Sequence, residues 1–328
     1  MKQTKWGVLG VSGHFIQRVV VPLSHSESVQ VAAIASRDRG KAEAAAAKWG
    51  IPKAYGSYEE LLSDPEIDAI YNPLPNHLHL EWIKKSADAG KPMLCEKPLG
   101  LNAREVQEAI NYTEKKGVPL MEAFMYRFHP QWVRAKELSA CGEIGSINVV
   151  QSHFTYKNSD PDNIRNRLEA GGGGILDIGC YAVSAARFIF GEEPVRVASL
   201  VNRSPEFGTD VLSSGILQFP SGHSTFTVST QTYGAQEVHI LGSGGSISIE
   251  VPFNIYPDVT MPSYISTGIG ERVYEAGPDD QYQLMFEAFS EALEEGRPVP
   301  TQVTDALKNQ KVLDALFRAE ESGAWEDV

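Results

Sequence analysis

The sequence predicts two domains: an α/β domain with a parallel sheet over residues 1–122, and an α+β domain with a large antiparallel sheet over residues 123–328. Three observations support this division. A chain of 328 residues is too long for one ordinary domain and fits two. Strand-like and helix-like segments alternate through the first 122 residues. After about residue 145, strand-like segments follow one another with short turns between them.

The first part of the chain alternates apolar runs of strand length with helical segments whose starts are readable. Ser57 with Glu60, and Asn102 with Glu105, have the spacing of capping boxes that open helices. Short strands separated by helices indicate βαβ units and therefore a parallel sheet. The predicted strands are Trp6–Val11, Val29–Ala35, Ile67–Tyr71, Pro92–Cys95 and Val118–Met121.

The second part of the chain is dominated by strands. Consecutive strands joined by tight turns favour antiparallel pairing, and three helical segments complete an α+β arrangement with helices on one face of the sheet. The predicted strands are Ile147–Tyr156, Val195–Val201, Val211–Phe219, Ser224–Ser229, Glu237–Leu241 and Ile247–Val251. The predicted helices are Cys180–Phe190, Tyr282–Glu294 and Val303–Glu321.

The charge of the chain limits its partners. A net charge of -13 argues against a nucleic-acid partner, which requires a basic surface to neutralise phosphates. It does not exclude a nucleotide cofactor, because backbone N–H groups and a few local cations bind phosphate on an acidic protein. No metal site is expected, because these histidines show no ligand spacing: His129, His153, His223 and His239.

The cysteines and the apolar runs indicate a cytoplasmic protein. Cys95, Cys141 and Cys180 are odd in number and widely spaced, which predicts neither a disulfide framework nor a zinc site. They fit buried free thiols in a reducing compartment. No apolar run approaches ~18 residues, so no membrane-spanning helix is expected. The first residues do not resemble a secretion signal.

A glycine-containing turn follows the first predicted strand and opens a helix. Such a turn brings backbone N–H groups close to the pyrophosphate of a dinucleotide. The match to a G-x-G-x-x-G pattern is incomplete, because Ser12 and Phe15 stand at the second and third glycine positions. An ordinary strand–turn–helix junction is the alternative. The repeated βαβ alternation favours cofactor binding through Gly10, Val11, Ser12, Gly13 and Phe15.

The tip of the second predicted strand carries cations. An NAD enzyme uses an acid here to bind the ribose 2′-hydroxyl, whereas an NADP enzyme uses a cation to bind the 2′-phosphate. Ser36, Arg37 and Lys41 fit NADP, while Asp38 fits it less well. A solvated cluster of surface charges is the alternative. The prediction is NADP, with NAD as the second choice of cofactor.

Lys97 follows the Pro92–Cys95 strand directly. Ligands of open α/β sheets bind at the carboxyl ends of the strands, and a lysine before proline is held extended. Lys97 is therefore a candidate to bind a substrate oxygen or to lower the pKa of a neighbouring hydroxyl. An ordinary surface lysine at a strand end is the alternative.

A carboxylate and a phenol stand four residues apart in the second domain. Asp177 and Tyr181 share one face if a helix begins here, and a tyrosine near a lysine and a carboxylate suits alcohol–carbonyl interconversion as an acid–base. The alternatives are a helix N-cap for Asp177 and a core aromatic for Tyr181. The preceding Gly171–Gly174 fits either a flexible hinge or a close-packed crossing of the backbone.

These residues together resemble one enzyme family. Glu96-Lys97-Pro98, Asn76 with His79, and Asp177 with Tyr181 look like the signature of the glucose–fructose oxidoreductase/inositol dehydrogenase (Gfo/Idh/MocA) family. The resemblance covers essentially the whole chain. It is greatest to the dihydrodiol dehydrogenase and NADP-dependent D-xylose dehydrogenase branch, through three stretches: Pro73–His77, Leu94–Leu99 and Phe124–Pro130.

The resemblance implies roles for particular residues. It implies an N-terminal Rossmann domain and a C-terminal domain built on a large, mostly antiparallel open sheet whose face often forms a dimer. Lys97 would orient substrate, before a peptide bond to Pro98 that is compatible with the cis form. Asp177 would bind substrate hydroxyls and Tyr181 would be the acid–base. The remaining residues implied to contact cofactor are Leu74, Asn76, His79, Glu96 and Arg127, and those implied to line the substrate site are Tyr156 and Arg165.

The expected function is hydride transfer between NADP and a sugar, polyol or vicinal diol. The substrate would be a small molecule, and the protein would be a homo-oligomer, a dimer or a dimer of dimers, formed through the C-terminal sheet. Two alternatives remain open. One is a nicotinamide-dependent enzyme without net redox change, cleaving glycosides or exchanging hydride between sugars on a tightly bound cofactor. The other is a non-catalytic NADP-binding protein.

Overall fold

The structure, a computed structural model, describes residues 3–328. The chain divides into two compact units. The N-terminal unit contains the residues up to Met125 together with Tyr282–Leu307, and the C-terminal unit contains Tyr126–Gln281 and Lys308–Val328. The sequence placed the boundary at residue 122 and the whole of 282–307 in the second domain, so the structure reassigns that segment to the first.

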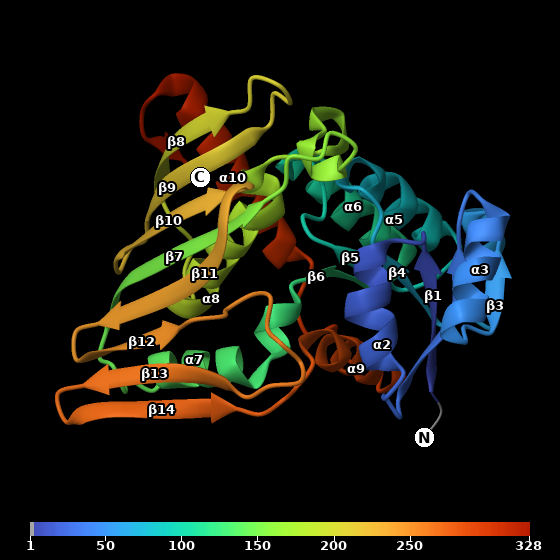
Figure 1. The fold of residues 1–328 in the computed structure, drawn as a ribbon, viewed down its shortest axis with the longest axis horizontal. Helices are drawn as coiled ribbons and strands as arrows, with labels where there is room; N and C mark the ends of the chain where they lie inside the picture. Colours follow the sequence, from blue (N-terminus) through green and yellow to red (C-terminus); the bar gives the residue numbers. More distant parts are fainter. Residues whose placement is uncertain (1–2) are drawn as a thin grey trace. The chain divides into compact units, whose positions relative to one another are not determined.

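Six parallel strands form the sheet of the N-terminal unit (Figure 1). Their order is β3-β2-β1-β4-β5-β6, the arrangement of a Rossmann sheet, in which the order reverses beside β1 and creates a ligand-binding crevice. This confirms the predicted parallel sheet. The strands are β1 Thr4–Leu9, β2 Val29–Ala35, β3 Lys53–Tyr55, β4 Ala69–Asn72, β5 Met93–Glu96 and β6 Leu120–Ala123.

The helices of this unit begin where the sequence indicates. Ser57 accepts a hydrogen bond from the backbone N of Glu60, and Asn102 accepts one from that of Glu105, both at 3.1 Å. Both predicted N-caps are confirmed. The helical segments are α1 Gly13–Phe15, the π-helical turn η1 Ile16–Val20, α2 Val21–Leu23, α3 Arg39–Trp49, α4 Tyr58–Leu62, the 3-10 turn η2 Asn76–Leu78, α5 His79–Asp88, α6 Ala103–Lys116 and α9 Gln281–Glu294.

Helix α9 explains why a distant segment belongs to the N-terminal unit. The indole Nε1 of Trp6 on β1 donates to Ser290 Oγ at 3.1 Å. The ring of Phe286 lies 4.6 Å from that of Trp6 and 5.1 Å from that of Tyr71. Buried aromatic pairs of this kind contribute strongly to core packing, so α9 covers strands that lie more than 200 residues earlier in the chain.

Nine strands form the sheet of the C-terminal unit, in the order β14-β13-β12-β11-β7-β10-β9-β8-β15. Only β7 and β10 pair in parallel; the other neighbours are antiparallel. The predicted sheet is confirmed. The strands are β7 Ile147–Lys157, β8 Arg196–Arg203, β9 Asp210–Gln218, β10 His223–Ser229, β11 Gln231–Gly242, β12 Gly245–Ile249, β13 Met261–Thr267, β14 Gly270–Ala276 and β15 Glu326–Asp327.

Helices cover one face of this sheet and leave the other face open. The hydroxyl of Ser199 on β8 donates to the carbonyl of Leu316 at 2.6 Å. On the open face, Leu200 is 72%, Ile216 43% and Tyr264 42% exposed. The helical segments are η3 Met125–Phe128, α7 Pro130–Ala140, η4 Ile164–Asn166, η5 Leu168–Ala170, η6 Ile175–Gly179, α8 Cys180–Phe190 and α10 Thr304–Ser322, of which η6 is a π-helical turn.

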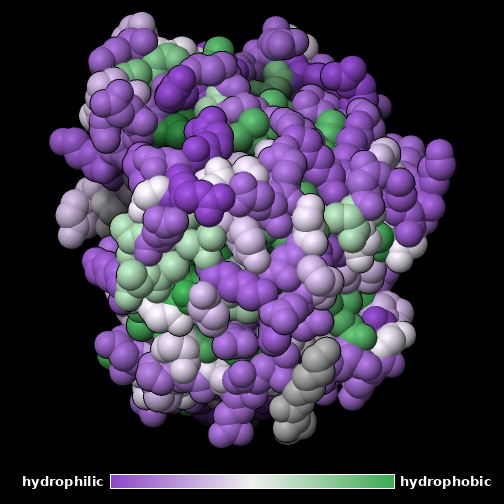
Figure 2. All heavy atoms as spheres, turned by 90° about the vertical axis from the view of Figure 1, so that its right-hand side faces the viewer, coloured by the Kyte–Doolittle hydropathy of each residue, from purple (hydrophilic) through white to green (hydrophobic). Residues whose placement is uncertain are grey.

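One segment departs from the expectation about apolar runs. Leu168–Phe190 is long and apolar enough to cross a membrane by length and composition, but 83% of its apolar window is buried inside the protein. Its composition is therefore explained by packing in the core. On the face of the molecule that includes α3 and β3, hydrophilic side chains predominate and apolar ones form small separate patches (Figure 2).

All three cysteines are free thiols. Cys95 and Cys180 are buried as expected, but Cys141 is exposed, because it follows the last turn of α7 at its solvent-facing end. Burial raises the pKa of the Cys95 thiol well above its ordinary value, so that cysteine is protonated and inert.

Candidate active site

The first turn of the N-terminal unit is shaped to admit a ligand close to the backbone. Gly10 follows β1 with a φ of +99°, a conformation that favours glycine. A Cβ at Gly10 would lie 3.2 Å from Leu74 Cδ2, whereas a Cβ at Gly13 would meet nothing within 4 Å. The turn is therefore tight on one side and open on the other, which fits the approach of a pyrophosphate.

The two residues that replace glycines in this turn have structural roles. The Oγ of Ser12 caps the helix by accepting from the backbone N of Phe15 at 3.1 Å, which explains a serine at the second glycine position. The ring of Phe15 is fully buried, 6.0 Å from that of Tyr71. The backbone N–H of Phe15 is therefore bound to Ser12, and the Phe15 side chain stabilises the turn by packing in the core. Val11, between Gly10 and Ser12, is half-buried.

The tip of β2 presents cations to solvent. The carboxylate of Asp38 caps α3 by accepting from the backbone N of Lys41 at 3.2 Å. Ser36 is buried and accepts from the backbone N of Asp38, while Arg37 and the side chain of Lys41 are exposed. Arg37 also hydrogen-bonds Tyr58, opposing the burial that raises the pKa of that phenol. Arg37, Asp38 and Lys41 are all exposed, and their charges sum to a positive value, which fits a 2′-phosphate.

Lys97 is half-buried and lies just beyond β5, followed by a cis peptide bond to Pro98. Hydrogen bonds hold the residues on both sides of Lys97 in place. The Tyr71 hydroxyl donates to Glu96 Oε1 at 2.6 Å, and the backbone N of Leu99 donates to Glu122 Oε1 at 2.8 Å. Glu96 is nearly buried and bound to Tyr71, so it holds the strand end that leads to Lys97.

His79 joins the Lys97 turn to the turn after β4. Its ring nitrogens lie 2.9 Å from the carbonyl oxygen of Pro98 and 2.7 Å from that of Leu74, and its side chain is fully buried. Burial lowers the pKa of His79 to about 4, outweighing the two carbonyls, which favour the charged form. Buried between these two carbonyls, His79 holds the two turns together, and its contact with cofactor stays a prediction. Asn76, half-buried, begins the 3-10 turn between them.

In the C-terminal unit, three of the predicted substrate-site residues meet. The Tyr156 hydroxyl donates to Asp177 Oδ2 at 2.6 Å, and Arg165 Nε donates to the same oxygen at 3.1 Å. Burial and the charge of Asp177 raise the pKa of Tyr156 well above its ordinary range, and Asp177 raises that of Arg165. Tyr156 is therefore a fixed proton donor to a paired carboxylate. These contacts bring together residues from β7, η4 and η6.

Tyr181 lies one turn further along, in α8. It is 5% exposed, and the rings of Tyr126, Phe154 and Phe253 lie 6.0, 5.9 and 5.2 Å from its own. It is near enough to Arg165 to raise the pKa of that guanidinium slightly. The aromatic surroundings are those of a core tyrosine, and they are also a dry environment in which a phenol's proton affinity is sensitive to its neighbours.

The local helix differs from the expected one. Asp177 lies within the π-helical turn η6, with its backbone N bound to the carbonyl of Gly173 at 3.0 Å, and not at an N-cap. The four residues from Asp177 to Tyr181 therefore run from a π-helical turn into the first turn of α8, and not along one α-helix. Single π turns are frequent at functional sites.

Arg127 binds within the C-terminal unit. Its Nη2 donates to Ser184 Oγ at 2.8 Å, its Nε donates to the Tyr126 hydroxyl at 3.3 Å, and its guanidinium lies 5.3 Å from the centre of the Phe188 ring. Its contact with cofactor stays a prediction.

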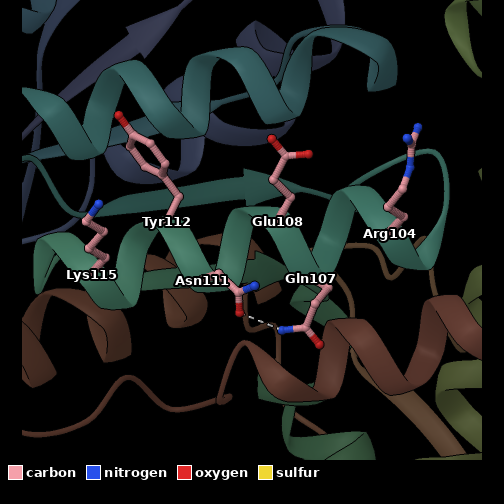
Figure 3. A pocket seen from close by; sticks show the side chains of 6 residues that line it. All are labelled: Arg104, Gln107, Glu108, Asn111, Tyr112 and Lys115. Atoms are coloured by element: carbon pink, nitrogen blue, oxygen red, sulfur yellow. Dashed lines mark hydrogen bonds between the residues drawn. The ribbon is translucent and has the colours of Figure 1, made fainter.

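Two hollows on the surface of α5 and α6 contain none of the predicted site residues. The first, about 470 Å³, is lined by one face of α6 (Figure 3). Its residues are Arg104, Gln107, Glu108, Asn111, Tyr112 and Lys115. Gln107 is bound to Asn111 at 2.9 Å and the charges are mixed, so no set of buried polar groups converges there. Among residues 3–328, no group of three or more His, Cys, Asp or Glu is placed to hold a metal ion.

Sequence reasoning missed three residues that organise these regions. Tyr58 contacts Arg37, Glu122 binds the backbone beyond Lys97, and Asp210 binds the segment before Asp177. A hint in the sequence exists only for Tyr58, because it follows the predicted N-cap Ser57. Glu122 and Asp210 lie in strands whose sequence does not indicate a partner.

Comparisons with known proteins agree with the observed fold. The model of an oxidoreductase family with an NAD-binding Rossmann fold, GFO/IDH/MocA, matches residues 4–124, and that of the GFO/IDH/MocA C-terminal domain matches residues 132–248. D-xylose 1-dehydrogenase (NADP(+)) 2 from Haloferax volcanii is 39% identical over 322 residues, 97% of this chain and 98% of the relative. Trans-1,2-dihydrobenzene-1,2-diol dehydrogenase from Mus musculus is 37% identical over 249 residues, 75% and 74% of the two chains. The crystal structure of aldose-aldose oxidoreductase from Caulobacter crescentus, complexed with glycerol, has a TM-score of 0.92 at 25% identity over 100% of both chains.

Proposed function

This chain belongs to the GFO/IDH/MocA family of NAD(P)-binding oxidoreductases, and we propose that it transfers hydride between NADP and a CH–OH group of a sugar, polyol or vicinal diol. The observation that carries this proposal is the cluster in which Tyr156 and Arg165 hold Asp177, one turn before Tyr181. A fixed carboxylate can bind two neighbouring hydroxyls, and a phenol can exchange the proton that hydride transfer leaves behind.

The residues of the N-terminal unit fit the cofactor. Gly10 and Gly13 bring the backbone close to the pyrophosphate, and Ser36, Arg37 and Lys41 hold the ribose 2′-phosphate. The nicotinamide ring supplies or accepts the hydride. The exposed Arg37 and Lys41, with Asp38 as the N-cap of α3 between them, favour NADP over NAD.

The remaining chemistry is proton transfer and positioning. Tyr181 takes the proton of the substrate hydroxyl as the alcohol is oxidised, and returns it during reduction. Lys97 binds the oxygen that reacts and lowers the pKa of the groups around it. Asp177 accepts hydrogen bonds from the neighbouring substrate hydroxyls. The raised pKa of Tyr156 keeps that phenol protonated on Asp177, which leaves the exchange of protons to Tyr181.

A second function is favoured by one similarity. The fold matches an aldose-aldose oxidoreductase along its whole length, which supports hydride exchange between two sugars on a retained cofactor as the alternative. An enzyme of that kind, or one that cleaves glycosides through transient oxidation, would keep NADP through dialysis and turn over without added cofactor. A non-catalytic NADP-binding protein would turn over none of these substrates.

The open face of the C-terminal sheet supports a homo-oligomer, a dimer or a dimer of dimers. Strand register places Tyr264 and Ile216 in one row across this face, and Leu200 lies beside Ile216 on the neighbouring strand. An Ile216→Glu variant should lower the mass measured by light scattering if this face is the interface. Three free thiols support a cytoplasmic location.

The function is tested by a substrate screen and one variant. Aldoses, inositols, dihydrodiols and keto-sugars are assayed with NADPH and NADH separately by absorbance of the reduced cofactor. Tyr181→Phe should lower kcat on the order of 10²–10⁴-fold. Tyr112→Phe, on the surface of α6, is the matched control and should keep wild-type turnover. Wild-type turnover in Tyr181→Phe would remove Tyr181 from the mechanism.

A further inference from the structure

A second buried carboxylate, Asp210, lies next to the segment that carries Asp177. Asp210 is the first residue of β9 and is 2% exposed. Its Oδ2 accepts hydrogen bonds from the backbone N of Ile175 at 2.6 Å and from the hydroxyl of Ser213 at 3.1 Å. Since a carboxylate at this depth needs such donors, Asp210 is bound firmly to the main chain of this segment.

The glycine-rich segment is shaped around this carboxylate. Gly173 has a φ of +120°, and a Cβ there would overlap Asp210 Oδ1. A Cβ on Gly174 would lie 3.3 Å from Oδ2, and one on Gly172 would overlap the carbonyl of Arg165. Of the two interpretations of Gly171–Gly174, the structure supports the close-packed crossing, because glycines let the carboxylate reach the backbone.

The segment bound by Asp210 leads directly to both proposed functional groups. Ile175 is the first residue of η6, which contains Asp177 and continues into α8 with Tyr181. The backbone of Gly173 makes two further hydrogen bonds. Its N donates to the carbonyl of Arg165 at 2.9 Å, and its carbonyl accepts from the N of Asp177 at 3.0 Å. A shift of the Ile175 peptide would therefore displace Asp177 and its partner Arg165 together.

The charge of Asp210 also reaches this cluster. Burial raises the pKa of Asp210, while the donors Ile175 N and Ser213 oppose the rise. Asp210 contributes, after burial and Asp177, to the raised pKa of Tyr156. The positive charge of Arg203, at the end of β8, also lowers the pKa of Asp210.

We propose that Asp210 is a positioning residue for the oxidoreductase reaction, because its carboxylate fixes the Ile175 peptide and thereby the placement of Asp177 and Tyr181. The inference rests on the proposed function for the roles of those two residues. Gly173 is the complementary part of this arrangement, since a side chain there would overlap the carboxylate, and Gly174 leaves little room beside it. Misplacing reacting groups by about 1 Å can lower a rate on the order of 10²-fold.

The test compares Asp210→Ala with Asp210→Asn in the full chain. Asp210→Ala should lower kcat, per folded enzyme, by about 10–100-fold and leave the KM for NADPH unchanged. Asp210→Asn should recover most of kcat, because its amide oxygen can still accept from Ile175. Asp162→Asn, an exposed aspartate of the same unit, is the matched control. A purely structural role would lower the folded fraction and leave kcat per folded enzyme as it is.

Hydrogen exchange measured by mass spectrometry provides a readout without substrate. Peptides covering residues 171–181 should exchange faster in Asp210→Ala than in wild type, while peptides of the N-terminal sheet stay unchanged. If Asp210→Ala does not fold, Ser213→Ala should show the same pattern with a smaller effect. Unchanged exchange, or unchanged kcat in the folded variants, overturns the proposal. A wild type without turnover on the whole panel overturns the proposed function instead, and exchange still decides whether Asp210 holds the segment.

Discussion

The two units hold their functional side chains in different ways. Around Lys97, side chains bind the backbone: His79 contacts the carbonyls of Leu74 and Pro98, and Glu122 binds the N–H of Leu99. Around Asp177, the Tyr156 and Arg165 side chains bind the functional carboxylate itself. These bonds are in addition to the backbone anchor that Asp210 provides at Ile175. Loss of an anchor in the N-terminal unit should therefore loosen the fold, whereas loss of a partner in the C-terminal cluster should change the chemistry of one group and leave the fold intact.

The largest expected effect is that of His79→Ala on stability. The substitution leaves a cavity and removes the N–H that the neutral imidazole donates to one of the two buried carbonyls, which should lower the free energy of unfolding by about 3 kcal/mol. Urea denaturation measures it. His77→Ala, an exposed neighbour, should change stability by less than about 0.5 kcal/mol. Equal stability of the two variants would show that the Lys97 turn does not depend on His79.

A pH dependence of stability should follow from the same histidine. The unfolded imidazole binds a proton near pH 6.5 and the native one only near pH 4, so between these values the unfolded state holds more protons and stability rises with pH. The stability that depends on a neutral His79 is fully present above pH 6.5, and it is lost as the pH falls to about 4. At pH 5 wild type should have lost about 2 kcal/mol that His79→Gln does not lose. Parallel pH curves for the two proteins would contradict the depressed pKa.

Arg165→Met should affect catalysis more than stability. Removing the cation takes the Arg165 donor away from Asp177 Oδ2, which should lower kcat/KM by about 10–100-fold, with the free energy of unfolding within about 1 kcal/mol of wild type. Arg167→Met, two residues away and bound to Glu169 on the surface, is the control. A loss of stability without loss of kcat/KM would reverse the comparison between the two units.

Tyr156→Phe should have the smallest effect of the four. It removes one hydrogen bond to a carboxylate that Arg165 still holds, so kcat/KM should fall by about 3–10-fold. Tyr233→Phe, on an exposed tyrosine of β11, should show no change. If Tyr156→Phe matched the loss in Tyr181→Phe, Tyr156 would exchange protons and the assignment of Tyr181 would need revision.

Local patterns predicted the elements whose partners lie close in sequence. The parallel sheet, the caps at Ser57 and Asn102, and helix α8 at Cys180–Phe190 all follow from short-range signals. Strands β3, β13, β14 and β15 were missed. β3 has three half-buried residues, β13 contains Pro262 and two serines, β14 is an exposed, charged edge without an alternating apolar face, and β15 has only two residues.

The contacts that sequence could not predict are long-range ones. Asp210 meets Ile175 from a strand 35 residues later, and nothing in the residues around it indicates that partner. The resemblance to known enzymes placed Tyr156 and Arg165 with Asp177, although their spacing along the chain did not. It also placed His79 beside the cofactor, which stays a prediction, and the structural link between the carbonyls of Leu74 and Pro98 was not expected.

The return of α9 to the first sheet has a consequence for biosynthesis. A ribosome that has released only residues up to Met125 has delivered all six Rossmann strands but not the Phe286 ring that packs against Trp6 and Tyr71. The nascent nucleotide-binding unit must then keep this apolar surface exposed, or shielded by a chaperone, while more than 150 further residues are synthesised. Early folding of the first unit is therefore incomplete until the last part of the chain emerges.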